Sequence, residues 1–194
     1  MTAFKNGERN NVRAPVMIAM TKVFSDAEIK SAADYFAALK PGVGYTKVVE
    51  TATVAKSYVG GGAMRFAMAD GSKEPIGKRI IVLPQDEARA KLRDPKSGFI
   101  DYVPLGSVRK GAALAAGGNG KTVACAICHG PNLKGLGEVP AITGRPATYM
   151  FRQLNDMKNG HRTGPWVELM KQVVAKLDDD DMIALSAYLG SRDP

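Results

Sequence analysis

The chain has 194 residues, of which 45% are hydrophobic and 7% aromatic, and 27 Lys+Arg against 19 Asp+Glu give a net charge of +8. This composition is typical of a globular protein with one large or two small domains. No stretch approaches the roughly 18 consecutive apolar residues of a transmembrane helix, and the N-terminus lacks the apolar segment of a secretory signal peptide. The basic residues form no run and do not alternate with aromatics, so we expect no nucleic-acid partner.

The first 41 residues repeat the end of the chain. When the sequence is aligned with itself at an ungapped offset of 153 residues, Phe4–Arg9 aligns with Met157–Arg162 and Met17 aligns with Met170. Such self-similarity indicates that one structural unit occurs twice. Ser25 begins the sequence Ser-Asp-Ala-Glu, a capping box that predicts a helix running to about residue 39.

Residues 42–104 are rich in Gly, Pro and β-branched side chains. Three segments read as short strands, at residues 46–54, 79–83 and 99–103, and Gly60–Gly62 reads as a flexible break. A segment of this length is too long for a bare linker. We therefore expect an irregular, strand-containing connector, to which the sequence assigns no chemical function.

The remaining residues show helical patterns. Ser107 is a candidate N-cap for an Ala-rich helix that Gly117 and Gly118 would end. Apolar periodicity then predicts a helix over 149–157 and a last helix over 178–189, whose first turn carries four consecutive aspartates at the positive end of the helix dipole. These patterns predict a mainly α fold.

A C-x-x-C-H motif occurs at Cys125, Cys128 and His129, and this motif is the attachment signature of c-type haem. Two thiols one helical turn apart can bond to the two vinyl groups of one haem edge, and the adjacent imidazole can then reach the iron. In haem proteins of this kind the iron takes that His, with Met or His on its other side.

Two other interpretations of the motif remain open. A thioredoxin-like pair would need a strand-to-helix junction, whereas a Gly/Asn/Lys loop precedes Cys125. A zinc site could combine the two thiols and His129 with the distant His161.

Residues from about 105 to 194 resemble a class I c-type cytochrome, of the kind found as the C-terminal haem domain of soluble bacterial di-haem cytochromes c. The shared pieces are the helix with Gly111, the motif, the stretch ending at Pro140, the helix beginning near Tyr149 and the helix carrying Tyr188.

This resemblance implies one covalent haem c, with thioether bonds from Cys125 and Cys128 and with His129 as the proximal iron ligand. The carbonyl of Pro140 would accept a hydrogen bond from Nδ1 of that His. Gly111 would allow its helix to cross the last helix closely, against Leu185 and Tyr188.

Met170 would be the sixth ligand of the iron, in a loop before the last helix, and His161 is its rival. Tyr149, Trp166 and Arg145 would line the haem edge or its propionates. Met150, Met157 and Met182 are expected in the hydrophobic core.

Together with the repeat, the resemblance divides the chain into three parts. Residues 1–41 would be the C-terminal remnant of a first cytochrome c domain whose haem motif is missing, residues 42–104 the connector, and residues 105–194 the haem domain. Met17 then has no haem supplied by this chain, and a missing or separate first haem half is a possible partner.

The function that this implies is that of a soluble c-type cytochrome. It would carry single electrons between redox partner proteins and would not be an enzyme. One alternative is a haem enzyme or sensor with an open sixth position. Another is the cytochrome subunit of a dehydrogenase complex, with residues 1–104 as a docking surface. The family implies a periplasmic location, because haem is attached to such motifs outside the bacterial cytoplasm.

Overall fold

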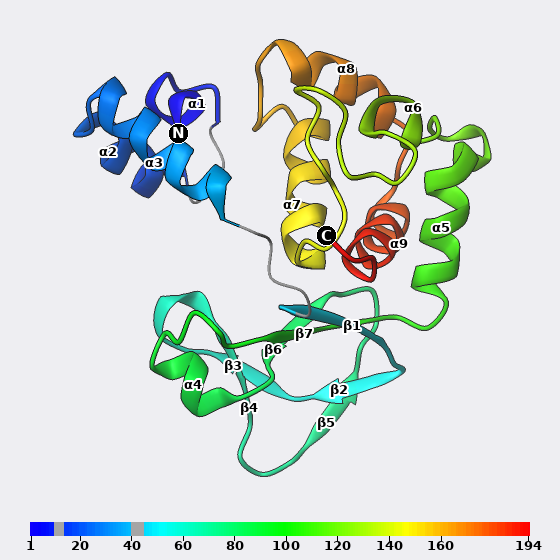
Figure 1. Ribbon diagram of the computed structural model, residues 1–194. Helices are drawn as coiled ribbons and strands as arrows, with labels where there is room; N and C mark the ends of the chain where they lie inside the picture. The colour runs from blue at the N-terminus through cyan, green and yellow to red at the C-terminus, as the bar shows by residue number, and fades with distance from the viewer. Residues whose placement is uncertain (10–13, 40–44) are drawn as a thin grey trace. The chain divides into compact units, whose positions relative to one another are not determined.

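The computed structural model describes residues 1–9, 14–39 and 45–194 (Figure 1). The chain divides into two compact units, one formed by Met1–Pro41 with Gln153–Ala175 and the other by Gly42–Arg152 with Lys176–Pro194. The three-part division expected from the sequence remains a prediction, and its boundary between residues 41 and 42 lies outside the described residues. None of the helices in the described ranges is long and apolar enough to cross a membrane.

The first unit is helical. It contains α1 (Thr2–Lys5), α2 (Ala14–Lys22), α3 (Asp26–Ala38), α8 (Pro165–Val174) and the second half of α7 (Ala147–Lys158). Arg9 and Arg162, which correspond to each other in the sequence repeat, form an antiparallel β-bridge in this unit. Both guanidinium groups donate to Oε1 of Gln153, at 2.7 and 3.0 Å.

The sequence repeat is also a repeat of secondary structure. Helix α2 corresponds to α8, and α3 corresponds to α9 (Asp179–Gly190), each at the same 153-residue offset. Ser25 caps α3 through a capping box with Glu28, as predicted, and Asp178 caps α9 through the same box with Asp181. Because a capping box satisfies two backbone N–H groups at once, it sets the same start for both helices.

The connector forms three small sheets in the second unit. The first sheet has three strands in the order β1 (Thr46–Glu50), β7 (Phe99–Val103), β6 (Ile81–Pro84). Strand β7 pairs with β1 in parallel and with β6 antiparallel. The other two are antiparallel pairs, β2 (Thr53–Ala55) with β5 (Lys73–Pro75) and β3 (Ser57–Val59) with β4 (Arg65–Ala67). A short helix, α4 (Glu87–Lys91), follows β6.

One detail of the predicted connector was wrong. The strand expected over 46–54 is broken into β1 and β2, because Thr51 Oγ1 turns the chain by bonding to the carbonyl of Thr53. The segment Gly60–Gly62 lies in the turn that joins β3 to β4, where Gly62 takes a φ of 68°. Val54, Ile76, Ile81 and Leu83 form one buried hydrophobic cluster of the connector.

The haem-motif part of the second unit is built on two crossing helices. Helix α5 (Ser107–Gly117) packs on α9, and α6 (Ala126–His129) follows a short turn. The N-cap of α5 is Gly106 rather than the predicted Ser107, since only the left-handed backbone of Gly106, with a φ of 80°, brings the chain into the helix. A Cβ on Gly111 would lie 2.0 Å from the carbonyl oxygen of Ala184 and 2.7 Å from Cβ of Tyr188, so Gly111 is the point of closest approach.

Asp101 joins the connector to the start of α7. Its side chain, on the central strand β7, is fully buried, and Oδ2 accepts a hydrogen bond from the backbone N–H of Ala147, while Oδ1 has no partner among the described residues. Burial raises the pKa of Asp101 to about 6, and the bond from Ala147 offsets only part of that effect.

We expect this carboxyl to make stability depend on pH. Between about pH 4 and pH 6 the folded protein keeps a proton that the unfolded chain has released, so the free energy of unfolding should fall as pH rises through this range, by on the order of 2–3 kcal/mol. Asp101→Asn should remove this slope. Urea unfolding of both proteins at a series of pH values tests the prediction, and an unchanged slope in the variant would contradict it.

Candidate haem site

The two cysteines and the histidine of the motif lie on one turn of helix. Cys125 is the N-cap of α6, its backbone N–H donates to the carbonyl of Ala115 on α5 at 2.9 Å, and its own carbonyl accepts from the N–H of His129 at 3.0 Å. The side chain of Cys128 is exposed, whereas His129 is buried. The turn therefore places two thiols one helical turn apart, with the imidazole directly after the second.

The imidazole of His129 is held by the backbone. Its Nδ1 lies 2.8 Å from the carbonyl oxygen of Pro140. A carbonyl can only accept a hydrogen bond, so Nδ1 is the donor in this contact, and in the neutral ring with this tautomer Nε2 keeps the lone pair that a metal needs. This is the contact that the resemblance implied, and it fixes both the tautomer and the orientation of the ring.

The loop between His129 and Pro140 needs a glycine at its start. Gly130 has a φ of 80°, and a Cβ there would lie 2.8 Å from the carbonyl oxygen of Gly135. The N–H of Gly135 donates to the carbonyl of His129 at 2.9 Å, and the N–H of Ile142 donates to Leu133 at 2.9 Å. These bonds fold the loop back so that Pro140 reaches the histidine.

An apolar cluster adjoins the motif. Leu133, Met150 and Leu189 are its buried members. The partly buried side chains that pack against them are Cys125, Ala126, Ile142, Tyr149 and Tyr188. Such a surface suits the face of a large apolar ring system. Met150 is thus a core residue, as expected, and Met182 is also fully buried, on α9.

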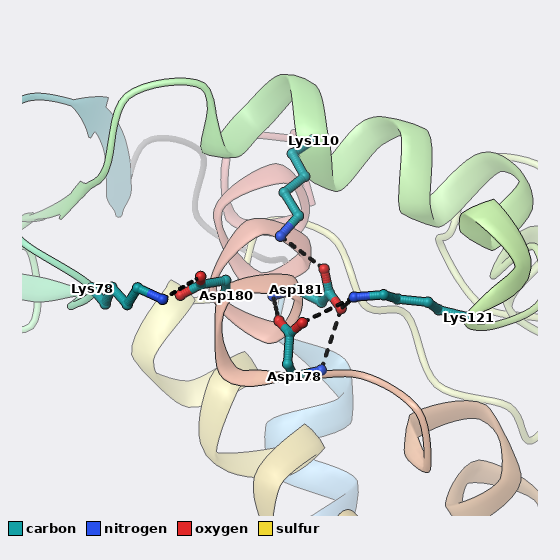
Figure 2. Close-up of polar contacts among 6 residues, drawn as sticks. All are labelled: Lys78, Lys110, Lys121, Asp178, Asp180 and Asp181. Carbon is teal, nitrogen blue, oxygen red and sulfur yellow. Dashed lines mark hydrogen bonds and ion pairs between the residues drawn. The ribbon is translucent and has the colours of Figure 1, made fainter.

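Ion pairs link the segment before the motif to the start of α9 (Figure 2). The carboxylate of Asp181, with only 2% of its side chain exposed, pairs with Nζ of Lys110 at 2.8 Å and with Nζ of Lys121. Lys121 also pairs with Asp178 at 2.9 Å. Because Lys121 lies four residues before Cys125, its bonds hold the segment that leads into the motif against the start of α9.

The pKa values of the two carboxyls follow from these contacts. The hydrogen bond from Lys121 lowers the pKa of Asp178 to about 2. Burial acts to raise the pKa of Asp181, but the bonds from Lys110 and Lys121 more than offset it, so the pKa is lowered. Both groups are therefore charged at neutral pH. The sequence indicated only that these aspartates suit a helix dipole, and it contained no signal for their lysine partners.

A further ion pair joins Lys78 of the connector to Asp180 of α9, with 2.7 Å between Nζ and Oδ2 (Figure 2). The side chains of Lys78 and Asp180 are 80% and 42% exposed to solvent. An exposed pair of this kind contributes little to stability.

The remaining predicted site residues lie on other elements. Met170 is half-buried on α8, not in a loop as expected, because Pro165 at the first helical position and an apolar face with Val167 and Val174 start and support that helix. Trp166, on the first turn of α8, is 62% exposed. His161, the rival ligand, is exposed beside Asp156, with 3.8 Å between Nδ1 and Oδ1.

Arg145 and Tyr149 lie at the start of α7. Nε of Arg145 donates to the carbonyl of Ala141 at 3.0 Å, and Tyr149 packs on the apolar cluster beside Cys125. Their roles toward a haem remain predictions.

The structure does not favour a thioredoxin-like thiol pair. The residues that lead into Cys125 are a 3-10 turn, Gly118–Gly120, and an irregular segment rather than a strand. Burial raises the pKa of the Cys125 thiol, whereas a reactive redox thiol needs a lowered pKa. In the part of the chain that the structure describes, no three His, Cys, Asp or Glu side chains are grouped so that they could hold a metal ion.

Residues 108–193 match the family model described as Cytochrome c. Cytochrome c-554(548) of Halomonas halodenitrificans is 34% identical over 83 residues, which cover 42% of this chain and 100% of that protein. Cytochrome c4 of Stutzerimonas stutzeri is 31% identical over 133 residues, which cover 61% of this chain and 63% of that protein. The chain thus spans less than two thirds of the length of this second relative.

A solved structure of cytochrome c4 from Acidithiobacillus ferrooxidans has a similar fold, with a TM-score of 0.59, 21% identity and coverage of 98% of this chain and 78% of that one. This likeness concerns the fold alone and agrees with the mainly α architecture expected from the sequence. The sequence similarity to cytochrome c-554(548) extends over the whole of that relative. The chain belongs to the cytochrome c family.

Proposed function

We propose that this chain carries single electrons between redox partner proteins through one covalently bound haem c. The observation that carries the proposal is the hydrogen bond between Nδ1 of His129 and the carbonyl of Pro140, directly after a turn that presents Cys125 and Cys128. That arrangement leaves Nε2 as a metal ligand of fixed orientation. When bound, the haem supplies an iron centre that gains or loses one electron.

The residues of the chain would do three things toward that group. Cys125 and Cys128 would form thioether bonds, His129 would bind the iron through Nε2, and Met170 would supply the sixth ligand. With His129 and Met170 both holding the group, no position would be left there for a substrate, so the role would be that of a carrier rather than an enzyme. Such a carrier would work in the periplasm.

We also propose that residues 1–41 are the last part of a first cytochrome c domain. The support is the correspondence of α2 with α8 and of α3 with α9. Tyr35 and Phe36 are 63% and 68% exposed on α3, whereas their counterparts Tyr188 and Leu189 belong to the apolar cluster beside the motif. A first haem-bearing half would cover the same face of α3, and Met17 is expected to bind no haem held by Cys125 and Cys128.

Covalent attachment is the direct test. The intact mass of the mature protein should exceed that of the polypeptide by one haem, acid-acetone should not extract the pigment, and no free thiol should titrate. Cys125→Ser and Cys128→Ser should each leave one thioether, and the double variant should release the haem on extraction. An extractable haem in the unaltered protein, or two titratable thiols, would contradict the proposal.

The visible spectrum separates the carrier from a haem enzyme or sensor. A carrier with His and Met ligands should be low-spin in both oxidation states, and the reduced protein should not bind carbon monoxide. A high-spin spectrum and rapid binding of carbon monoxide would instead indicate an open sixth position.

A further inference from the structure

The carboxyl of Asp101 is a buried titratable group that the proposed electron carrier does not use. It is fully buried on the central strand β7, and its Oδ2 accepts a hydrogen bond from the backbone N–H of Ala147. Its Oδ1 is buried and has no hydrogen-bond partner among the described residues. A buried carboxylate with one neutral donor is poorly stabilised in its charged form, so this group gains from binding a proton.

The strands beside Asp101 surround it with apolar side chains. The residues paired with Asp101 are Val48 on β1 and Val82 on β6. Successive side chains of a strand point to opposite faces of the sheet, so Lys47 on β1 and Tyr102 on β7 point away from the face that carries Asp101. Within the sheet, the carboxyl thus lies between two valines.

Two helix ends with opposite electrostatic effects meet at Asp101. The N-terminal end of α7 favours a negative charge and supplies the N–H of Ala147. The C-terminal end of α9 lies at the same point, because a Cβ on Gly190 would be 3.5 Å from the backbone nitrogen of Ala147 and 3.3 Å from Cγ2 of Val48. Such an end disfavours a negative charge. The support that α7 gives to the carboxylate is therefore offset in part by α9.

The charged groups on the surrounding elements have other environments. Those at this end of the elements are exposed to solvent, and they are Glu50 of β1, Arg145 before α7, and Arg192 and Asp193 after α9. Arg152 lies more than one turn further along α7, and the aspartates of α9 lie at the opposite end of that helix. Water screens exposed charges. Burial is accordingly the largest influence on the pKa of Asp101, and it raises this pKa to about 6.

The first turn of α7 connects Asp101 to the haem motif. Tyr149 and Met150 follow Ala147 by two and three residues, which is less than one helical turn. Both belong to the apolar cluster that also contains Leu189 of α9 and Cys125 of the motif. Asp101 and the motif are thus joined through one packed apolar region, across which charges interact more strongly than across water.

We propose that Asp101 takes up a proton when the haem is reduced, so that this chain couples electron transfer to proton transfer. The inference rests on the proposed carrier function. A redox partner supplies one electron, which converts Fe(III) to Fe(II), and water supplies up to one proton, which forms an O–H bond at Oδ1 of Asp101. Oxidation by the next partner reverses both changes. The physical reason is that the electron removes one positive charge from the iron, and a carboxylate that loses a nearby positive charge binds a proton more tightly.

The test is the reduction potential of the full-length, haem-loaded protein, measured from about pH 5 to about pH 8. The potential should fall as pH rises through about 6, because the charged carboxylate stabilises the oxidised iron. We expect the proton affinity of Asp101 to be at least about threefold higher in the reduced state. This difference corresponds to a fall of about 30 mV, since tenfold is about 59 mV for a one-electron couple.

Two carboxylate variants locate the proton. Asp101→Asn should lose this fall and should have a potential about 30 mV above that of the unaltered protein at pH 8, because the amide stays neutral. Glu50→Gln is the matched control. Glu50 also accepts an N–H at the start of a helix, from Val108 at 2.7 Å, but it is exposed, so its replacement should leave the pH dependence unchanged. Ionisable groups of the haem itself are common to all three proteins and cancel in the comparison.

A second measurement uses the unaltered protein. The carboxyl carbon-13 NMR signal of Asp101, assigned through the backbone signals of the same residue, is followed against pH in the reduced and in the oxidised protein. The midpoint of its titration should lie at least about half a pH unit higher in the reduced protein, which is the same threefold difference in proton affinity.

Three outcomes would overturn the inference. These are equal titration midpoints in the two oxidation states, an unchanged pH dependence of the potential in Asp101→Asn, or an equal loss of that dependence in Glu50→Gln. Failure of the carrier function is distinguished from these outcomes, because it would appear as a haem that acid-acetone extracts from the unaltered protein.

Discussion

Met170→Leu is expected to lower the reduction potential of the haem by on the order of 0.1 V, because a neutral thioether favours the reduced iron and leucine has no sulfur to replace it. The weak sulfur-to-iron absorption band of the oxidised protein should disappear, and the iron should become accessible to cyanide and carbon monoxide. Haem attachment should be unchanged, since Cys125 and Cys128 are intact. Potentiometry and the spectrum of the oxidised protein measure both effects.

Two matched substitutions test whether Met170 is the methionine concerned. Met150 and Met157 are buried, with 5% and 7% of their surface exposed, and replacing either by leucine conserves volume at a cost of less than about 1.5 kcal/mol. Met150→Leu and Met157→Leu should keep the sulfur-to-iron band and the potential. Survival of the band in Met170→Leu, with its loss in one of the other two, would show that the sixth ligand was assigned to the wrong helix.

Gly111→Ala should destabilise the protein by about 2–3 kcal/mol, because one added methyl group would force α5 away from α9. A Cβ at this position would lie 2.0 Å from the carbonyl oxygen of Ala184, which is backbone and cannot move without the helix. Separation of these helices should also weaken the ion pairs of Asp181 with Lys110. Urea unfolding followed by far-ultraviolet circular dichroism measures the loss.

Gly117→Ala is the control on the same helix. A Cβ there would have no neighbour within 4 Å, so the change in stability should stay within about 1 kcal/mol. Equal stability of Gly111→Ala and the unaltered protein would mean that α5 and α9 do not pack as closely as the structure describes.

Features that depend on a few neighbouring residues were determined by the sequence itself. The spacing of Cys125, Cys128 and His129 is that of one helical turn, and the capping boxes at Ser25 and Asp178 lie within four residues. The physical reason is that backbone geometry and local hydrogen bonds set these features, whatever the rest of the chain does. The mainly α fold followed from the same local signals, and the repeat was found by comparing the sequence with itself at an offset of 153 residues.

Features that depend on contacts across the chain were decided only by the tertiary structure. Asp101 is buried against Ala147, 46 residues away, and Asp181 meets Lys121, 60 residues away. The helical position of Met170 and the short strands β3 to β5 were also missed. The sequence does not show which side chains are buried or which distant residues they contact. Burial nevertheless raises the pKa of Asp101, and the contact with Lys121 lowers that of Asp178. The local sequence pattern therefore identified the residues of the haem motif, whereas only the tertiary packing showed the ion pairs and hydrogen bonds that surround them.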